Sequence, residues 1–374
     1  MTEKEAYIAF NLTEQVGSVK VGALVRQFGS VVAAWEVYPK KVARTGGAVD
    51  WQGELKKAAK FGVTLLTPAD AEYPERLRAA PSHPLVLYVK GDVTALARPS
   101  LALVGTRRAT PYGLDQAFKF AHDLAANGWM ILSGLALGID AEAHKGALAA
   151  GGVTVGIIGS GLDKFYPEEN RDLAREIVRK GGAVVSEFPF GRTADTTTFP
   201  QRNHVVAALA KGVVAIESPI KSGTLITTGI AADLGRTVMA VPGRVDSRSS
   251  AGCLHLIREG ARLVRHAKDV EEEMRDLLPR TASETKPKRD GMTRQAAAPA
   301  ATSEPPREEM PAPPFSLEEA MVMKHVDVEG IAIDELVRRT KLPAAKVNAV
   351  CMTLRLKGRV RYFPGNRVAL PRAD

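Results

Sequence analysis

Short apolar runs alternate with amphipathic stretches through the middle of the chain. Runs of four or five apolar residues predict strands that are buried on both faces, and the stretches between them predict helices. The predicted strands are Val86–Val89, Leu101–Val104, Trp129–Leu132, Thr154–Ile158, Ala183–Ser186, Val213–Ile216 and Thr237–Val241. The predicted helices begin near Leu114, Ile139, Asn170, Phe199 and Thr224. This order predicts an α/β fold built on a doubly wound, mostly parallel sheet across residues 69–278.

The N-terminal segment, residues 1–68, has a helical pattern instead. Gly17 and Gly22 lie around a short turn, and a second break follows at Phe28-Gly29-Ser30. The segment is similar to a helix-hairpin-helix or sterile-alpha-motif-like module, in which a glycine turn approaches a phosphate. The alternative, which we favour somewhat, is a packing or protein-contact domain.

The C-terminal part divides into a linker and a small domain. Residues 279–314 are crowded with Pro, Ala and charge and predict a disordered linker. Residues 315–374 contain three helical patterns and a hairpin around Pro364-Gly365-Asn366, which resembles a winged helix. The hairpin and the third helix, Pro343–Lys357, are basic, and this surface would bind nucleic acid or, equally well, a protein.

The composition indicates the kind of partner, the state of the cysteines and the cellular location to expect. The 374 residues carry a formal net charge of +9, which favours an anionic partner, with nucleic acid ahead of acidic metabolites. Only Cys253 and Cys351 are present, so we expect buried or inert thiols rather than a disulfide framework or a metal site. No signal peptide or membrane span is recognisable, so we expect a cytoplasmic protein.

The turn after Leu101–Val104 is the first candidate binding site. Its residues Gly105, Thr106, Arg107, Arg108 and Thr110 lie between a strand and a helix start, where unpaired N–H groups and partial positive charge favour an anion. Taken alone, the two arginines fit a solvated turn equally well.

Similar turns follow three other predicted strands, and the four turns together favour an anion-binding site over solvated turns. The four turns are GTRRAT (105–110), SGLALGID (133–140), GSGLDKFYPEEN (159–170) and SPIKSGTLITTG (218–229). Carboxyl ends of parallel strands gather at one rim of a sheet, so the turns are expected to line one groove. Several anion sites in a row suit a chain of phosphates, although any single glycine is explained by a tight turn alone.

A fifth segment, FPQRN, opens the helix near residue 199. Phe199 offers a face on which a base could stack, and Arg202 and Asn203 are expected at the exposed helix start. The alternative is that Phe199 caps the core and Arg202 pairs with a carboxylate such as Glu187 or Glu217.

These motifs, followed by GCLHLIREGARLV, resemble the DNA-processing protein A (DprA/Smf) family along nearly the whole chain. The resemblance implies a Rossmann-like domain that dimerises, binds single-stranded DNA, lowers the barrier posed by single-strand-binding protein and loads the RecA recombinase in natural transformation. It implies a groove led by Arg107 and lined by Gly105, Thr106, Ser133, Gly134, Phe199, Arg202, Asn203, Lys221, Ser222, Gly223 and Thr224. The glycine turns add Arg108, Gly159, Gly161 and Lys164.

The chain departs from the family at two places. His204 stands where many members have arginine, and Glu168 and Glu169 stand where some have a basic residue. Both changes reduce positive charge at the expected groove. Lys164 is the residue that we expect to compensate.

An enzyme of the same superfamily is the alternative. Lysine-decarboxylase-like nucleotide hydrolases carry a PGGxGTxxE motif, and Thr227 occupies the place of its glutamate in PIKSGTLIT. Glycosidic cleavage needs such an acid or base, so we expect no catalysis and no cofactor. Asp140, Glu142 and His144 suggest a metal site, but an N-cap and ordinary helix residues explain them better.

Overall fold

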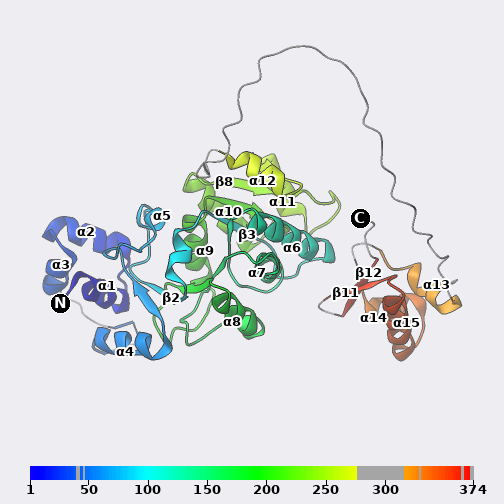
Figure 1. Cartoon of the computed structure of the whole chain (residues 1–374), viewed down its shortest axis with the longest axis horizontal. Helices are drawn as coiled ribbons and strands as arrows, with labels where there is room; N and C mark the ends of the chain where they lie inside the picture. The colour runs from blue at the N-terminus through cyan, green and yellow to red at the C-terminus, as the bar shows by residue number, and fades with distance from the viewer. Residues whose placement is uncertain (39–42, 45–46, 276–315, 328–329, 364–365, 371–374) are drawn as a thin grey trace, which may run out of the picture. The chain divides into compact units, whose positions relative to one another are not determined.

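The computed structural model describes residues 1–38, 43–44, 47–275, 316–327, 330–363 and 366–370. It divides into two compact units, Met1–Leu277 and Leu278–Asp374, which we describe separately (Figure 1). The predicted linker, residues 279–314, lies outside the described residues.

A nine-stranded sheet with the order β1-β2-β6-β5-β4-β3-β7-β8-β9 forms the centre of the first unit. All neighbours from β6 to β9 are parallel, while β2 pairs antiparallel with β6 and with β1. The prediction of a mostly parallel α/β sheet is confirmed. The strands are β1 Thr64–Leu66, β2 Leu87–Gly91, β3 Ser100–Val104, β4 Met130–Ser133, β5 Thr154–Ile157, β6 Ala183–Ser186, β7 Gly212–Ala215, β8 Thr237–Ala240 and β9 Arg262–Leu263.

The strand order reverses at β3. From there β4, β5 and β6 are added on one side and β7, β8 and β9 on the other. Val104 pairs with Ala215 at the carboxyl ends of β3 and β7, so the loops that follow these two strands begin side by side. Such a switch point is where open α/β sheets bind their ligands.

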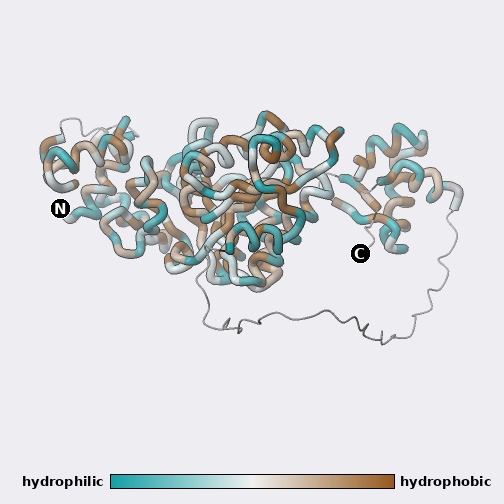
Figure 2. Tube along the Cα trace, turned by 90° about the horizontal axis from the view of Figure 1, so that it is seen from above, coloured by the Kyte–Doolittle hydropathy of each residue, from teal (hydrophilic) through white to brown (hydrophobic). Residues whose placement is uncertain are grey.

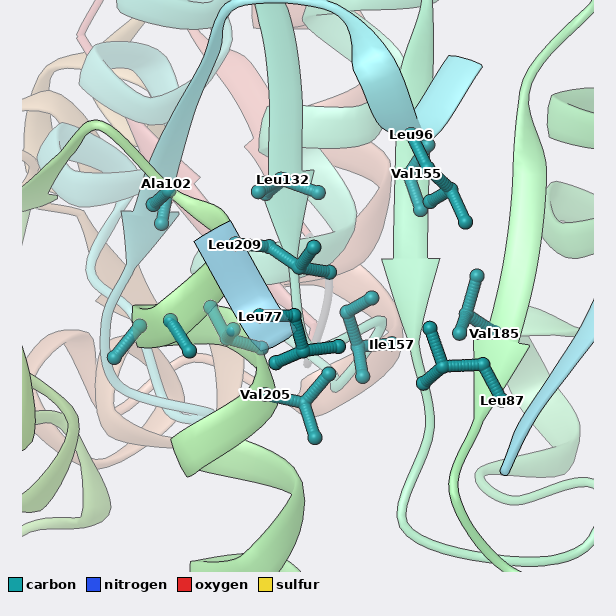
Figure 3. Close-up of a cluster of buried hydrophobic side chains, with 14 of the residues drawn as sticks. Leu77, Leu87, Leu96, Ala102, Leu132, Val155, Ile157, Val185, Val205 and Leu209 are labelled. Carbon is teal, nitrogen blue, oxygen red and sulfur yellow. The ribbon is translucent and has the colours of Figure 1, made fainter. Parts of the chain in front are cut away.

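Helices cover both faces of the sheet. Apolar residues alternate along β3, with Leu101 and Leu103 packing on α6 and α7 and Ala102 and Val104 facing the side that α9 and α10 cover. Figure 3 shows Leu209 of α9 packed in this second layer with Leu132. In Figure 2 brown, hydrophobic segments gather in the interior of the first unit. The helices are α5 Glu75–Arg78, α6 Pro111–Ala126, α7 Ile139–Ala149, α8 Arg171–Arg179, α9 Thr198–Leu209, α10 Gly223–Asp233, α11 Ala251–Arg258 and α12 Ala267–Glu273, with 3-10 turns η1 Val93–Ala97 and η2 Glu168–Asn170.

The N-terminal segment is helical, as expected, but its end joins the sheet. Thr64–Leu66, within the segment predicted to be helical, form β1, which pairs with β2 and buries Leu65 and Leu66. Phe10 makes edge contacts with Trp35 and Tyr38 in a separate core, at ring-centroid distances of 5.1 and 5.6 Å. The helices are α1 Glu3–Leu12, α2 Ser18–Phe28, α3 Val31–Val37 and α4 Trp51–Phe61.

The second unit combines three helices with a small sheet of order β10-β12-β11, the arrangement predicted as a winged helix. Part of its basic charge is neutralised within the unit, because Lys346 of α15 and Lys357 at the C-cap of α15 pair with Glu318 and Glu319 of α13. The elements are α13 Leu317–Met323, α14 Ile333–Thr340, α15 Ala344–Leu356, β10 Ile331–Ala332, β11 Arg361–Phe363 and β12 Arg367–Ala369.

Candidate nucleic-acid interface

A groove of about 330 Å³ opens at the carboxyl ends of β3 and β7. The loops after these strands form two of its walls, and the first turns of α9 and α10 complete it. The site residues predicted from the sequence that line this groove are Gly105, Thr106, Arg107, Arg108, Phe199, Arg202, Asn203, Lys221, Ser222, Gly223 and Thr224. The structure therefore brings most of the expected site residues to one place, although they come from separate parts of the sequence.

The loop after β3 presents its arginines at the mouth of the groove. Arg107 and Arg108 are exposed. Gly105 is required by close packing, since a Cβ there would lie 2.4 Å from the Ile139 side chain of α7. The Arg107 guanidinium carbon lies 4.6 Å from the centroid of the Phe199 ring, a cation–π contact. The ring expected to receive a base is thus in contact with the leading arginine.

The N-terminus of α6 is capped from within the chain. Thr110 is the N-cap, and its hydroxyl accepts a hydrogen bond from the Gly113 N–H at 3.2 Å. Glu217, two residues after β7, accepts hydrogen bonds from the backbone N–H and the hydroxyl of Thr110, both at 2.8 Å. The backbone N–H of Thr106 donates to the Glu217 carbonyl at 2.7 Å. The N–H groups of Thr110 and Gly113, expected to be unpaired, therefore have partners within the chain.

The start of α10 forms the opposite wall of the groove. Ser222 caps this helix and its hydroxyl lies 2.6 Å from that of Ser218. Asn203 of α9 donates from Nδ2 to the Gly223 carbonyl at 3.4 Å, which connects the starts of the two helices. Lys221 is exposed immediately before the cap, so its charge adds to the partial positive charge of the helix N-terminus.

A buried ion pair lies beneath the groove. Arg202 Nη1 is 3.7 Å from Asp140 Oδ2, and each side chain is only 8% exposed. Burial raises the pKa of Asp140, against the opposing effect of the Arg202 charge, and burial lowers the pKa of Arg202. A Cβ on Gly134 would lie 1.2 Å from Arg202 Nη1, so only glycine fits there.

This pair corrects three expectations. Arg202 is buried rather than exposed at the helix start, and its carboxylate partner is Asp140, not Glu187 or Glu217. Asp140 is not the N-cap of α7, because Gly138 holds that position.

A second, smaller hollow of about 30 Å³ adjoins the groove. It shares Arg107, Phe199 and Arg202 with the groove, and Tyr166 is among its other lining residues. The predicted residues Gly134 and Gly159 line this hollow rather than the groove itself.

Three predicted residues line neither hollow. Ser133 is fully buried and donates its hydroxyl to the Leu103 carbonyl at 2.6 Å, which gives it a structural role. Gly161 packs against the Pro189 carbonyl, and Lys164 is exposed in the same loop.

Glu168 is neutralised by its neighbour Arg171 through two hydrogen bonds of 2.5 Å. His204 lies outside the groove lining, with Nε2 3.4 Å from the Ser82 hydroxyl. Burial lowers its pKa. Its replacement of arginine therefore removes a charge beside the groove rather than within its lining.

Asp140, Glu142 and His144, which were considered as a metal site, each have a different partner within the chain. Glu142 pairs with Lys145 at 2.7 Å, and His144 Nδ1 lies 2.6 Å from the Thr154 hydroxyl. Burial, helped by the Arg202 charge, lowers the pKa of His144 to about 3, so the ring is neutral. Within the described ranges, no group of three or more His, Cys, Asp or Glu residues is placed to hold a metal ion.

The two cysteines are buried and unpaired, as expected. None of the helices in the described part of the chain is long and apolar enough to span a bilayer.

The sequence interpretation missed Glu217 as the partner of the Thr110 cap and Tyr166 as part of the site lining. Both left a signal. Glu217 is a carboxylate directly after the predicted strand Val213–Ile216, and Tyr166 lies within one of the four turns, GSGLDKFYPEEN (159–170).

Two family models match the chain. The model described as DNA recombination-mediator protein A matches residues 64–275, and the model described as DprA winged helix domain matches residues 296–366. The first match covers the sheet-containing part of the first unit, and the second match lies within the second unit.

Individual relatives match over all or part of the chain. Protein Smf of Synechocystis sp. is 30% identical over 392 residues, covering 98% of each chain. DNA processing protein DprA of Streptococcus pneumoniae is 40% identical over 217 residues, covering 58% of this chain and 74% of the relative.

Two solved structures are also similar. DNA processing protein A from Streptococcus pneumoniae superposes with a TM-score of 0.61 at 32% identity, covering 73% of this chain and 98% of that one. A structure titled for the single-stranded DNA binding mode of DNA processing protein A from Helicobacter pylori gives 0.52 at 28% identity, covering 58% and 98%.

The Asp140–Arg202 pair generates a stability prediction. Asp140→Leu leaves a buried guanidinium without its counter-charge and should lower the free energy of unfolding by about 3–5 kcal/mol. The double variant Asp140→Leu with Arg202→Met should recover most of this loss, because an apolar pair needs no charge compensation. Urea denaturation of both variants checks this. Asp172→Ala, in an exposed pair with Arg175, serves as the control and should change stability by no more than about 0.5 kcal/mol. Equal losses in the single and double variants would contradict the pairing.

His144 generates a pH prediction. The unfolded imidazole takes up a proton below its ordinary pKa of 6.5, while the folded one stays neutral down to about 3. Stability should therefore fall as the pH falls through this window, by up to about 1.4 kcal/mol per pH unit. Between pH 7 and 5 the wild type should lose roughly 2 kcal/mol more than His144→Gln. The exposed His122→Gln should follow the wild type, and a slope unchanged in His144→Gln would refute a neutral buried ring.

Proposed function

The chain belongs to the DNA recombination-mediator protein A family, and from this premise we propose that it binds single-stranded DNA across the groove at the β3 and β7 ends. The observation that carries the proposal is the charge of the groove lining. Arg107, Arg108 and Lys221 are exposed there, and Asp140, only 6% exposed, is the one carboxylate among the lining residues that the structure describes. A surface of this kind attracts the phosphates of a nucleic acid strand.

The aromatic ring within the groove favours a single strand over a duplex. Phe199 can stack on a base only if that base is unpaired, while Arg107 beside it reaches a phosphate. The relative from Helicobacter pylori is titled for single-stranded DNA binding, which supports the same assignment.

The proposed activity is binding without bond cleavage. Thr227 stands where the related hydrolases have a glutamate, and its hydroxyl donates to the Gly223 carbonyl at 3.1 Å. Asp140 is held by Arg202 beneath the surface. Neither group is a candidate general acid or base, so a nucleotide hydrolase is the less favoured alternative.

The later steps of the proposal follow the family. We propose that the protein acts in the cytoplasm as a homodimer, lowers the barrier posed by single-strand-binding protein and loads RecA on the strand during transformation and recombination. The description of the family as a recombination mediator supports the role in recombination.

The position of Arg107 in the groove predicts how its replacement should change DNA binding. Arg107→Ala should weaken binding of oligo-dT and of mixed-sequence oligonucleotides alike, roughly tenfold, because a phosphate contact carries no sequence information. The slope of log affinity against log salt concentration should become less steep by about 0.7, since one phosphate contact is lost. Fluorescence anisotropy at several salt concentrations measures both. Arg179→Ala, 72% exposed on α8, is the matched control and should bind as the wild type does. A loss restricted to certain base sequences would contradict a phosphate contact.

A competition experiment separates the two functions. Labelled oligo-dT bound to the wild type should resist excess duplex and excess mononucleotide. Efficient displacement by the mononucleotide, or release of free base from it, would favour the hydrolase. RecA filament formation on oligonucleotides coated with single-strand-binding protein then tests loading, which should be faster with the wild type than with Arg107→Ala.

A further inference from the structure

Exposed apolar side chains extend beyond the groove along the same rim of the sheet. Leu137, in the loop after β4, is 38% exposed, and Tyr166, in the loop after β5, is 49% exposed. Both line the second hollow, which shares Arg107 and Phe199 with the groove. The rim that holds the basic groove therefore continues as an apolar surface toward β5.

Tyr166 is the aromatic residue of this extension. Its ring centroid lies 6.1 Å from that of Phe199, and the two ring planes are tilted by 46°. The hollow of about 30 Å³ next to the two rings has room for water but not for a base. A base would thus lie against the exposed face of Tyr166 rather than inside the hollow.

The spacing of the rings suits an extended strand. Stacked nucleotides rise by about 3.4 Å each, so rings 6.1 Å apart match bases that are pulled out of their mutual stack. Phe199 is half-buried and in contact with Arg107, whereas half of the Tyr166 surface is open.

The charges around Tyr166 favour a base at the ring and a phosphate beside it. Lys164 is exposed two residues earlier, while Glu168 and Glu169 follow two and three residues later. Glu168 is paired with Arg171, so Glu169 is the carboxylate that would repel a phosphate here, and it does not repel a neutral base. The exposed Lys164 would attract a phosphate.

We propose that Tyr166 is a second base-stacking position, which extends the single-stranded DNA path from the groove toward the β5 side of the rim. This inference rests on the proposed function, since it names a further contact of the same strand. The Tyr166 ring binds a base of any sequence, because every base has a face that stacks.

An abasic-site scan tests this contact. A labelled dT oligonucleotide long enough to cover the rim is titrated with the wild type, Tyr166→Ala and Tyr166→Phe, with one base removed at each position in turn. Tyr166→Ala should bind the intact oligonucleotide roughly tenfold more weakly, and Tyr166→Phe should bind it as the wild type does. The wild type should lose affinity at one position whose removal no longer matters in Tyr166→Ala.

Matched controls separate the possible failures. Phe28→Ala removes an aromatic side chain of similar exposure, 38%, from α2 and should leave binding unchanged. If Arg107→Ala weakens binding but Tyr166→Ala does not, or if both proteins give the same abasic profile, the Tyr166 contact is refuted while the proposed function stands. If Arg107→Ala also binds as the wild type does, the proposed function itself fails.

Discussion

The reversal of strand order at β3 is the constraint on which the site depends. Parallel strands are connected by helices, and the helix after β3 covers one face of the sheet while the helix after β7 covers the other. The two loops therefore leave adjacent strand ends in opposite directions and cannot close over each other. The groove is the space that this divergence leaves, and its position follows from topology before any side chain is considered.

Hydrogen bonds and ion pairs within the chain determine which charged side chains stay available to a ligand. Glu217 binds Thr110, the N-cap residue of α6, and Asp140 pairs with Arg202 below the surface. Burying an ion pair costs several kcal/mol per charge in desolvation, so the Asp140–Arg202 pair is poorly explained as a stabilising device. It connects the start of α9 to the start of α7. The exposed cations of the groove lining, Arg107, Arg108 and Lys221, come from the two loops that diverge at the switch point.

The sequence predicted the strands and helices well because the spacing of buried residues within each element can be recognised from a few neighbouring residues. Every strand from β3 to β8 was located within about one residue at each end, and the helix starts within about three. β1 was missed because three residues carry no recognisable period. The ion pairs were missed for a different reason. Glu217 and Thr110 are 107 residues apart, and nothing in the pattern around either residue specifies which distant group it meets. The same applies to Lys346 and Glu318 in the second unit, where a surface that seemed uniformly basic from its sequence is partly neutralised.

The contact between Arg107 and Phe199 has a consequence for how the ring can be used. The Arg107 guanidinium lies over one face of the Phe199 ring, and such a cation–π pair contributes about 0.5–2 kcal/mol. A base that stacks on Phe199 without breaking this contact has only the opposite face of the ring available. The arginine therefore fixes from which side of the ring a strand can approach.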